Sequence, residues 1–444
     1  MQSPFLLFLV RVYCSAFVAC VLWLWTSCWP EFWSAVQPRV EAVKKQRTGH
    51  PQSPCNCPAC SAKHKQWELN KQRVIPSWRA QHSGRGRRKR VETDGYSCNN
   101  PACVYYQVTD SSLHALVGCG KHHGVDSTQY FKCQACGTKV TARWNTALYD
   151  LKTAAAEVAR VMTASSEGVD AAAASRIFAH DERTIRRWLL RTANHAERLH
   201  NRLLQKLVCR HLQLDELVTK VRGVKERIWV WVALDAHTKL ILVIRCGGRT
   251  RIDAQLFVHE LWSRLAPGAP PVFTTDDGLQ QYYYALTAHF GSWVPKAGKR
   301  FPVWQVDPRL LYGQLHKIKV GYKLKDMYTQ MLSGTRDEFR ETLQGMALTG
   351  KIMTAYVERV NLTLREHIPA LSRRTWSLPQ NEQSLEAQLE WGRAYYHFCR
   401  YHESLRLPTA KPGRYRSRTP AMAADLARQR WRVSDLLLMP VPPA

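Results

Sequence analysis

Short apolar runs separated by polar turns dominate the chain between about residues 210 and 320. Such runs, rich in Val, Ile, Leu and aromatic residues, predict buried strands. Helices are expected between them, at 254–265 and from Tyr282 to Phe290. Interspersed strands and helices predict an α/β core with a mixed sheet. In chain order, the expected strands are LQLDEL, RIWVWVALDAHT, KLILVIRCGG, PPVFTTD and LLYGQLHKIKV.

Residues 150–203 have the periodicity of helices rather than strands. An Ala-rich helix is expected from Leu151 to Thr163, and Gly168 ends this region. AAAASRIF then predicts a short helix, AHDE a turn, and RTIRRWLLRTANHAERLH a longer basic helix capped by Asp181. A short helix, a tight turn and a longer basic helix are typical of a helix-turn-helix domain.

The longer basic helix has two chemically different faces. Its apolar face, expected to pack inward, consists of Ile185, Trp188 and Leu189. Its basic face would meet DNA through Arg183, Arg186 and Arg187. The alternative is an ordinary helical hairpin whose basic face is only solvated.

Two closely spaced cysteine pairs mark residues 96–146. The pairs are Cys98 with Cys103 and Cys133 with Cys136, and Gly137 after the second pair tolerates a tight turn. Thiolates at such spacing can complete a tetrahedron around Zn²⁺, so we expect a structural zinc ribbon. The alternatives are a disulfide pairing or a substituted ligand set that includes Cys119, His122 or His123.

The flanking segments are less informative. Residues 1–36 are an apolar N-terminal segment in which only Arg11 is charged between 5 and 27, so membrane attachment remains an alternative. Residues 37–95 are expected to be a basic linker that contains GRGRRKR. Cys55, Cys57 and Cys60 within it are expected to be non-ligating, with a second small metal site as the alternative. We expect residues 406–444 to form a C-terminal tail.

Charge indicates the kind of partner. Lys and Arg number 64 and Asp and Glu 35, which gives a formal net charge of +29. Such an excess favours a polyanion, most simply nucleic acid, over a basic protein that lies on a membrane surface. The 14 cysteines occur partly in close pairs, which favours zinc binding in a reducing compartment over disulfides. The protein is therefore expected to be cytoplasmic and nucleoid-associated.

Three acidic positions follow or lie among apolar residues of the expected core. Asp215 lies in the first strand, and the doublet Asp276–Asp277 ends the fourth. Glu358 lies in a helix whose apolar residues recur at helical spacing, at Val357, Val360, Leu364 and Ile368. Carboxylates that converge from strand ends and a covering helix bind hard divalent cations, and two such ions can support in-line phosphoryl displacement.

Several stretches within residues 208–405 carry a family resemblance. The region resembles bacterial insertion-sequence transposases of the DDE type, whose core is ribonuclease-H-like, as in retroviral integrases. The resemblance implies that Asp215, Asp277 and Glu358 hold two Mg²⁺ or Mn²⁺ ions. We choose Asp277 over Asp276 because the family's acid precedes an aromatic by five positions, here Tyr282. The matching stretches are LQLDEL, WVWVALDAHTKLILVI, TTDDGLQQYYYALTAHFG, YVERVNLTLREHIPALSRRTWSL and YYHFCRYHESLRL.

The resemblance also implies a function. A transposase of this kind binds double-stranded DNA at terminal inverted repeats, cleaves 3′ ends, joins them to target DNA and works as a homo-oligomer. Arg359 and Arg365, on the helix with Glu358, are expected to reach phosphates. The alternatives are a catalytically silent DNA-binding regulator derived from a transposase and a membrane-anchored basic protein.

Overall fold

The computed structural model describes most of the chain from Ile75 onward: residues 75–82, 91–122, 126–276, 278–321, 323–346 and 348–442. The apolar segment at 5–27, the cysteines at 55, 57 and 60, and the GRGRRKR run therefore lie outside the described residues. His123 and Asp277 also lie outside them.

The first described region is built around a small antiparallel sheet. A short helix, α4 (Trp78–Gln81), precedes three strands in the order β1 (Leu116–Lys121), β2 (Gln129–Cys133) and β3 (Lys139–Thr141). Its core is small and consists mainly of Cys98, Cys103, Tyr105, Ala115, Leu116, Phe131 and Cys133. A core of this size leaves much of the region's stability to its cysteines.

Three helices follow, at the positions expected for a helix-turn-helix. They are α5 (Ala155–Ser166), α6 (Ala171–Phe178) and α7 (Glu182–Leu203). The carboxylate of Asp181 accepts hydrogen bonds from the amides of Arg183 and Thr184, so the expected N-cap is confirmed. The first helix starts later than Leu151 and continues past Thr163 to Ser166.

The C-terminal segment completes the core of these helices. Residues 406–444, expected as a tail, include the β12 (Leu407–Pro408) and β13 (Tyr415–Arg416) pair, α13 (Pro420–Ala423) and α14 (Val433–Leu438). Ala421, Leu436 and Leu437 are buried in the same cluster as Trp188 of α7. Long-range burial of this kind is not readable from local periodicity.

A six-stranded mixed sheet forms the next region, and the expected α/β class is confirmed. The strand order is β11-β10-β7-β4-β5-β6. Strand β7 pairs in parallel with β4 and β10, whereas the β4–β5, β5–β6 and β10–β11 pairs are antiparallel. The strands are β4 (His211–Thr219), β5 (Ile228–Asp235), β6 (Ile241–Gly247), β7 (Val272–Asp276), β10 (Tyr312–Val320) and β11 (Lys323–Ser333).

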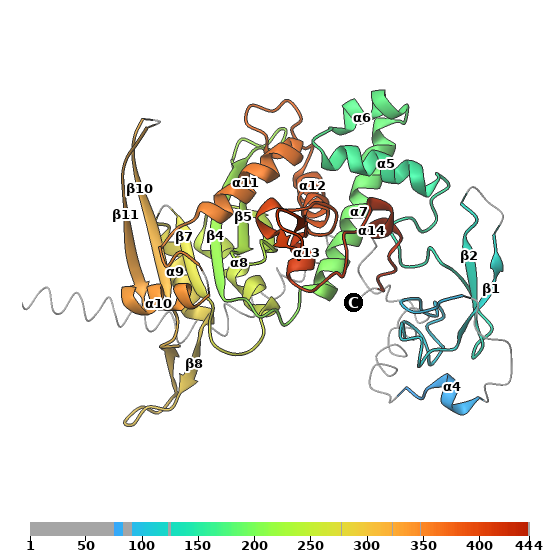
Figure 1. Cartoon of the computed structure of the whole chain (residues 1–444), viewed down its shortest axis with the longest axis horizontal. Helices are drawn as coiled ribbons and strands as arrows, with labels where there is room; N and C mark the ends of the chain where they lie inside the picture. Colours follow the sequence, from blue (N-terminus) through green and yellow to red (C-terminus); the bar gives the residue numbers. More distant parts are fainter. Residues whose placement is uncertain are drawn as a thin grey trace, which may run out of the picture. The chain divides into compact units, whose positions relative to one another are not determined.

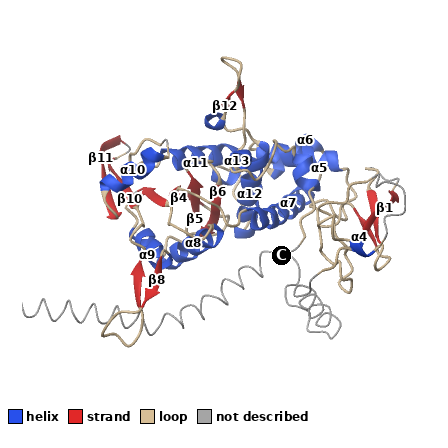
Figure 2. Cartoon of the chain, turned by 60° about the horizontal axis from the view of Figure 1, so that its bottom comes forward, coloured by secondary structure: helices blue, strands red, loops and turns tan. Residues whose placement is uncertain are grey.

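Helices cover both faces of this sheet (Figures 1 and 2). One face packs against α8 (Arg251–Arg264) and α9 (Gln280–His289), and the other against α11 (Ala355–His367) and α12 (Glu382–Ala394). Alternation along β4 explains this, because Leu212 and Leu214 lie in the first core and Leu217 in the second. The helix expected at 254–265 begins earlier because Thr250 and Asp253 form a capping box.

Several elements in the basic and aromatic region 291–352 were not expected. They are the hairpin of β8 (Gly291–Val294) and β9 (Val303–Val306), strand β11, and α10 (Arg336–Gly345). Strand β11 is largely exposed, so its sequence lacks the apolar run that would have revealed it. A short 3-10 turn (Pro369–Leu371) follows α11, and a π-helical turn (Tyr395–Cys399) and a second 3-10 turn (Glu403–Leu405) follow α12.

A buried polar network joins α7 to the sheet. His200 of α7 contacts the carboxylate of Glu390 on α12, and its Nε2 lies 3.1 Å from Nδ1 of His397. Arg393 is buried and donates hydrogen bonds to the carbonyls of Ile241 and Leu242 on β6, at 3.0 and 2.7 Å. The network fixes α7 against the core through groups that would be costly to bury without partners.

Candidate metal centres and nucleic-acid interface

The four predicted cysteine ligands come together. The sulfurs of Cys98, Cys103, Cys133 and Cys136 all lie within 4.8 Å of one another. Zn–S bonds of about 2.3 Å in a tetrahedron place the sulfurs about 3.8 Å apart. The Sγ atoms of Cys98 and Cys136 are 3.6 Å apart, and those of Cys103 and Cys133 are 3.8 Å apart. This donor set fits a single Zn²⁺ ion.

The backbone around the first cysteine pair is shaped for thiolates. The amides of Asn100 and Tyr105 point at the sulfurs of Cys98 and Cys103, at 3.5 and 3.4 Å. Gly137 has a φ of +75°, which allows the chain to turn directly after Cys136. All four cysteines are free thiols, so the disulfide alternative is wrong. Among the described residues, neither Cys119 nor His122 belongs to the cluster.

The sheet brings Asp215 and Asp276 onto neighbouring strands. Leu214 of β4 pairs with Thr275 of the parallel strand β7, so the next residues, Asp215 and Asp276, follow side by side. On β4, Gln213 accepts a hydrogen bond from the amide of Val357 on α11. Asp215 points to the same face two residues later, as strand alternation requires. The Nδ2 of Asn361 on α11 donates to Asp215 Oδ2 at 2.7 Å.

Glu358 joins Asp276 through a lysine. The Lys317 ammonium contacts Oδ2 of Asp276 and lies 2.5 Å from Oε1 of Glu358. Thr354, one turn before Glu358, donates to the same Oε1 at 2.6 Å. Asp276 and Lys317 are nearly buried, whereas the Glu358 side chain is 42% exposed. Asp276 and Glu358 are therefore bridged by a cation, and Asp215 lies near enough for their charges to raise its pKa. Among the described residues, these three acids do not form a group with metal-ligand spacing, whereas the four cysteines do.

Only one member of the Asp276–Asp277 doublet lies among the described residues. Asp276, the member of the doublet not expected to bind metal, contacts Lys317. Asp277 lies outside the described residues, so its choice as the metal ligand remains a prediction. Lys317 was not expected at all. The stretch LLYGQLHKIKV could have indicated it, because strand alternation places Lys317 on the same face as Leu315, a largely buried residue.

The electrostatics of the site are dominated by crowded carboxylates. Burial raises the pKa of Asp215 to about 7, and the neighbouring charges of Glu216, Asp276 and Glu358 add to the effect. Burial opposes ionisation of Glu358 as well, but hydrogen bonds from Lys317 and Thr354 outweigh it and lower its pKa. Asp215 is thus the carboxylate whose ionised form is least compensated, and a bound cation would stabilise it.

The arginines predicted to meet DNA from α7 divide into two kinds. Arg183 and Arg187 are exposed. Arg186 is half-buried and its Nε donates to Glu182 at 2.7 Å. Ile185 and Trp188 are buried, as expected, and Leu189 is half-buried and packs against the same core. Arg183 and Arg187 are thus presented to solvent from the first turns of α7, where a recognition helix makes its contacts.

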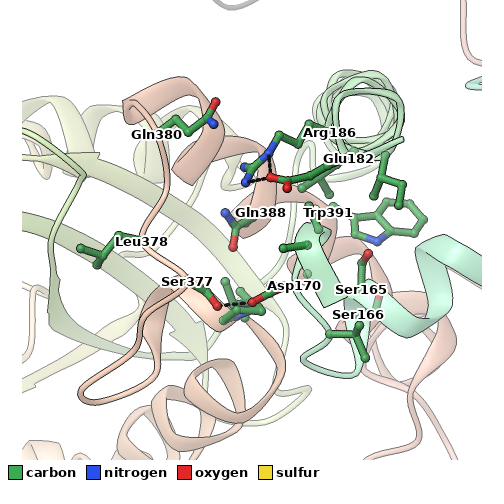
Figure 3. Close-up of a pocket in the computed structure, with 18 of the residues that line it drawn as sticks. Ser165, Ser166, Asp170, Glu182, Arg186, Ser377, Leu378, Gln380, Gln388 and Trp391 are labelled. Atoms are coloured by element: carbon green, nitrogen blue, oxygen red, sulfur yellow. Dashed lines mark hydrogen bonds and ion pairs between the residues drawn. The ribbon is translucent and has the colours of Figure 1, made fainter. Parts of the chain in front are cut away.

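Arg186 lines a cavity of about 310 Å³ between α7 and the segment that follows α11. Figure 3 shows Arg186 with Glu182 on one side and Gln380, Gln388 and Leu378 on another. Ser377 contacts Asp170, the N-cap of α6, across the floor of this cavity. Arg359 on α11 is exposed, and Arg365 is half-buried.

Any functional assignment must rest on the residues of the chain itself. The sequence matches no protein-family model and no curated protein. Within the described ranges, no helix is long and apolar enough to cross a bilayer.

Proposed function

We propose that the protein is a DNA transposase of the DDE type, which cleaves 3′ ends at terminal inverted repeats and transfers them to target DNA. The observation that carries the proposal is the convergence of Asp215, Asp276 and Glu358 from β4, β7 and α11. Three acids on two neighbouring central strands and one covering helix suit metal-dependent phosphodiester chemistry better than general acid–base work by a histidine.

The sheet supports a ribonuclease-H-like core. Three antiparallel neighbours, β6, β5 and β4, continue into β7 and β10, which run parallel to β4. This is the order expected of that fold. The four-cysteine cluster supports the finer reading of residues 96–146 as a zinc ribbon, and α6 and α7 support a helix-turn-helix.

The donor set fits Mg²⁺ or Mn²⁺, which prefer carboxylate oxygens. The Lys317 ammonium between Asp276 and Glu358 supports this proposal, because two of the acids already hold a positive charge. We propose that Asp215 and Glu358, with Asp276 or Asp277, hold the ions. When bound, these ions would acidify a water or 3′-hydroxyl and stabilise the leaving oxygen. Asn361 would hold the Asp215 carboxylate in place.

The test is strand cleavage of labelled DNA from the two flanks of the coding sequence, with Mg²⁺ or Mn²⁺. Asp215→Asn and Glu358→Gln should each reduce cleavage by orders of magnitude while duplex binding stays near normal, because binding rests on other elements. Asp276→Asn and Asp277→Asn decide which member of the doublet is the ligand. Asp337→Asn, an exposed acid on α10, is the matched control.

The outcomes separate the proposal from its rival. If none of the four active-site variants differs from the parent, the DDE mechanism is excluded. If the parent binds DNA but neither cleaves it nor takes up Mn²⁺, the catalytically silent regulator is the better description.

A further inference from the structure

Trp376 is the most exposed large apolar residue that the structure describes, at 97% of its surface. The next most exposed tryptophans among the described residues, Trp293 and Trp262, expose 51% and 48%. Trp376 lies in the segment between α11 and α12, which we call the Trp376 loop (residues 372–381). A tryptophan left wholly in water on a loop is a common mark of a binding partner.

The Trp376 loop is held at both ends, so the exposure is built into the fold. The hydroxyl of Ser372 donates to the carbonyl of Arg365 at 2.8 Å, and the amide of Arg222 donates to the carbonyl of Pro379 at 3.0 Å. Beside the indole, Ser377 contacts Asp170 of the helix-turn-helix region. A side chain presented from a tethered loop loses little conformational entropy when it binds.

Two exposed arginines precede this tryptophan in the loop. They are Arg373 and Arg374, and the chain contains no acidic residue between Glu366 and Glu382. Arg374 has a φ of +56°, so the backbone turns sharply just before the tryptophan. An exposed aromatic ring on a loop that also carries two arginines suits a base and its flanking phosphates.

The Trp376 loop follows the C-terminal end of α11, the helix that carries Glu358 and Asn361. Arg365, in the last turn of α11, accepts a hydrogen bond from the Ser372 hydroxyl on its carbonyl. Burial lowers the pKa of Arg365, the nearby charge of Arg373 lowers it further, and Asp215 acts in the opposite direction. Arg365 therefore lies within electrostatic range of both Arg373 and Asp215.

We propose that the Trp376 loop binds an unpaired DNA base, with Trp376 stacked on the base and Arg373 and Arg374 on the adjacent phosphates. The proposal rests on the proposed function, because the ligand is DNA. It adds a preference for unpaired over paired DNA, which duplex binding by α7 does not provide. Stacking is indifferent to sequence, so the loop would recognise the unpaired state of the DNA rather than a base order.

The experiment measures affinity of the full-length protein for two probes of the same sequence, with 2-aminopurine at the same place. One probe is a fully paired 30-bp duplex, and the other has a three-nucleotide unpaired segment around the 2-aminopurine. The parent protein should bind the second probe more tightly and quench its fluorescence. Trp376→Ala should weaken binding of that probe on the order of ten-fold, within the range that loss of one stacked aromatic produces, and leave paired-duplex affinity unchanged.

Matched variants exclude a general defect. Trp376→Phe should retain most of the preference because it keeps an aromatic face. Trp262→Ala removes a half-exposed tryptophan from α8, on the opposite face of the sheet, and should behave like the parent. Replacing Arg373 and Arg374 together by Ala should weaken both probes and reduce the salt dependence of binding.

The results distinguish the two proposals. If the parent binds DNA without preferring the unpaired probe, or if Trp376→Ala weakens both probes equally, the stacking proposal is overturned and the proposed function stands. If the parent binds neither probe, the proposed function itself fails.

Discussion

At the scale of single residues, Lys317 decides the charge of the acidic site. Its ammonium lies between Asp276 and Glu358. A divalent ion entering the same place must displace this charge, because two cations cannot share it without strong repulsion. If the proposed function holds, Lys317 is an internal competitor of the metal, and a DNA phosphate would be an alternative partner for its ammonium.

We predict that Lys317→Met raises the affinity of the DNA-free protein for Mn²⁺ on the order of ten-fold, because it removes this competitor and leaves the carboxylates without a counter-charge. Titration calorimetry at pH 8 measures the effect directly. Lys317→Arg should stay near the parent value, as should Lys323→Met, which removes an exposed lysine from β11. An unchanged or weaker affinity in Lys317→Met would show that the lysine does not occupy the metal position.

At the scale of elements, the small antiparallel sheet depends on its cysteines. The core around β1–β3 is slight, and the four sulfurs supply its tightest cluster. We predict that a zinc chelator, or Cys103→Ser, unfolds residues 96–146 while the six-stranded sheet remains intact, because metal binding and folding are coupled in sites of this kind.

Hydrogen exchange followed by mass spectrometry resolves the two regions. Amide protection should fall in β1–β3 and stay constant in β4 and β5. Cys119→Ser, which alters a cysteine outside the cluster, is the control. Equal protection with and without chelator would contradict a structural zinc site.

At the scale of the whole molecule, buried histidines set the response to acid. Burial lowers the pKa of His200, His211, His289 and His402 to about 4 and that of His195 to about 3. Burial would raise the pKa of Glu390, but the charge of Arg393 and the contact with His200 outweigh it and lower the pKa. In the unfolded chain these groups take up protons near their ordinary pKa values, 6.5 for histidine and 4.5 for glutamate.

We predict that the free energy of unfolding is highest near neutral pH and falls by several kcal/mol between about pH 6.5 and pH 4, because the unfolded chain then binds more protons than the folded one. The contribution of Glu390 is lost at the lower end, as the pH falls below 4.5. Urea unfolding midpoints at a series of pH values measure the trend. Glu390→Gln should lower the midpoint at pH 7.5, whereas Glu341→Gln, exposed on α10, should not. A midpoint that rises on acidification would contradict the buried neutral histidines.

Local chemistry in the sequence determined much of this protein. The apolar runs placed β4 to β7 and β10. The turn AHDE and the cap at Asp181 placed the start of α7, and the spacing of the cysteines identified all four members of the cluster. These features depend on neighbours within a few residues, so periodicity, capping and ligand spacing suffice to reveal them. The same local patterns brought Asp215 and Glu358 into view as candidates.

Only the tertiary structure decided how these parts meet. The side-by-side placement of Asp215 and Asp276 depends on the parallel register of β4 and β7, and the contacts of Lys317 depend on β10 lying next to β7. The association of α7 with Glu390, and of α14 with α5, joins residues far apart in the chain. Register and long-range burial are set by the packing of complementary faces, which leaves no mark in any single stretch of sequence.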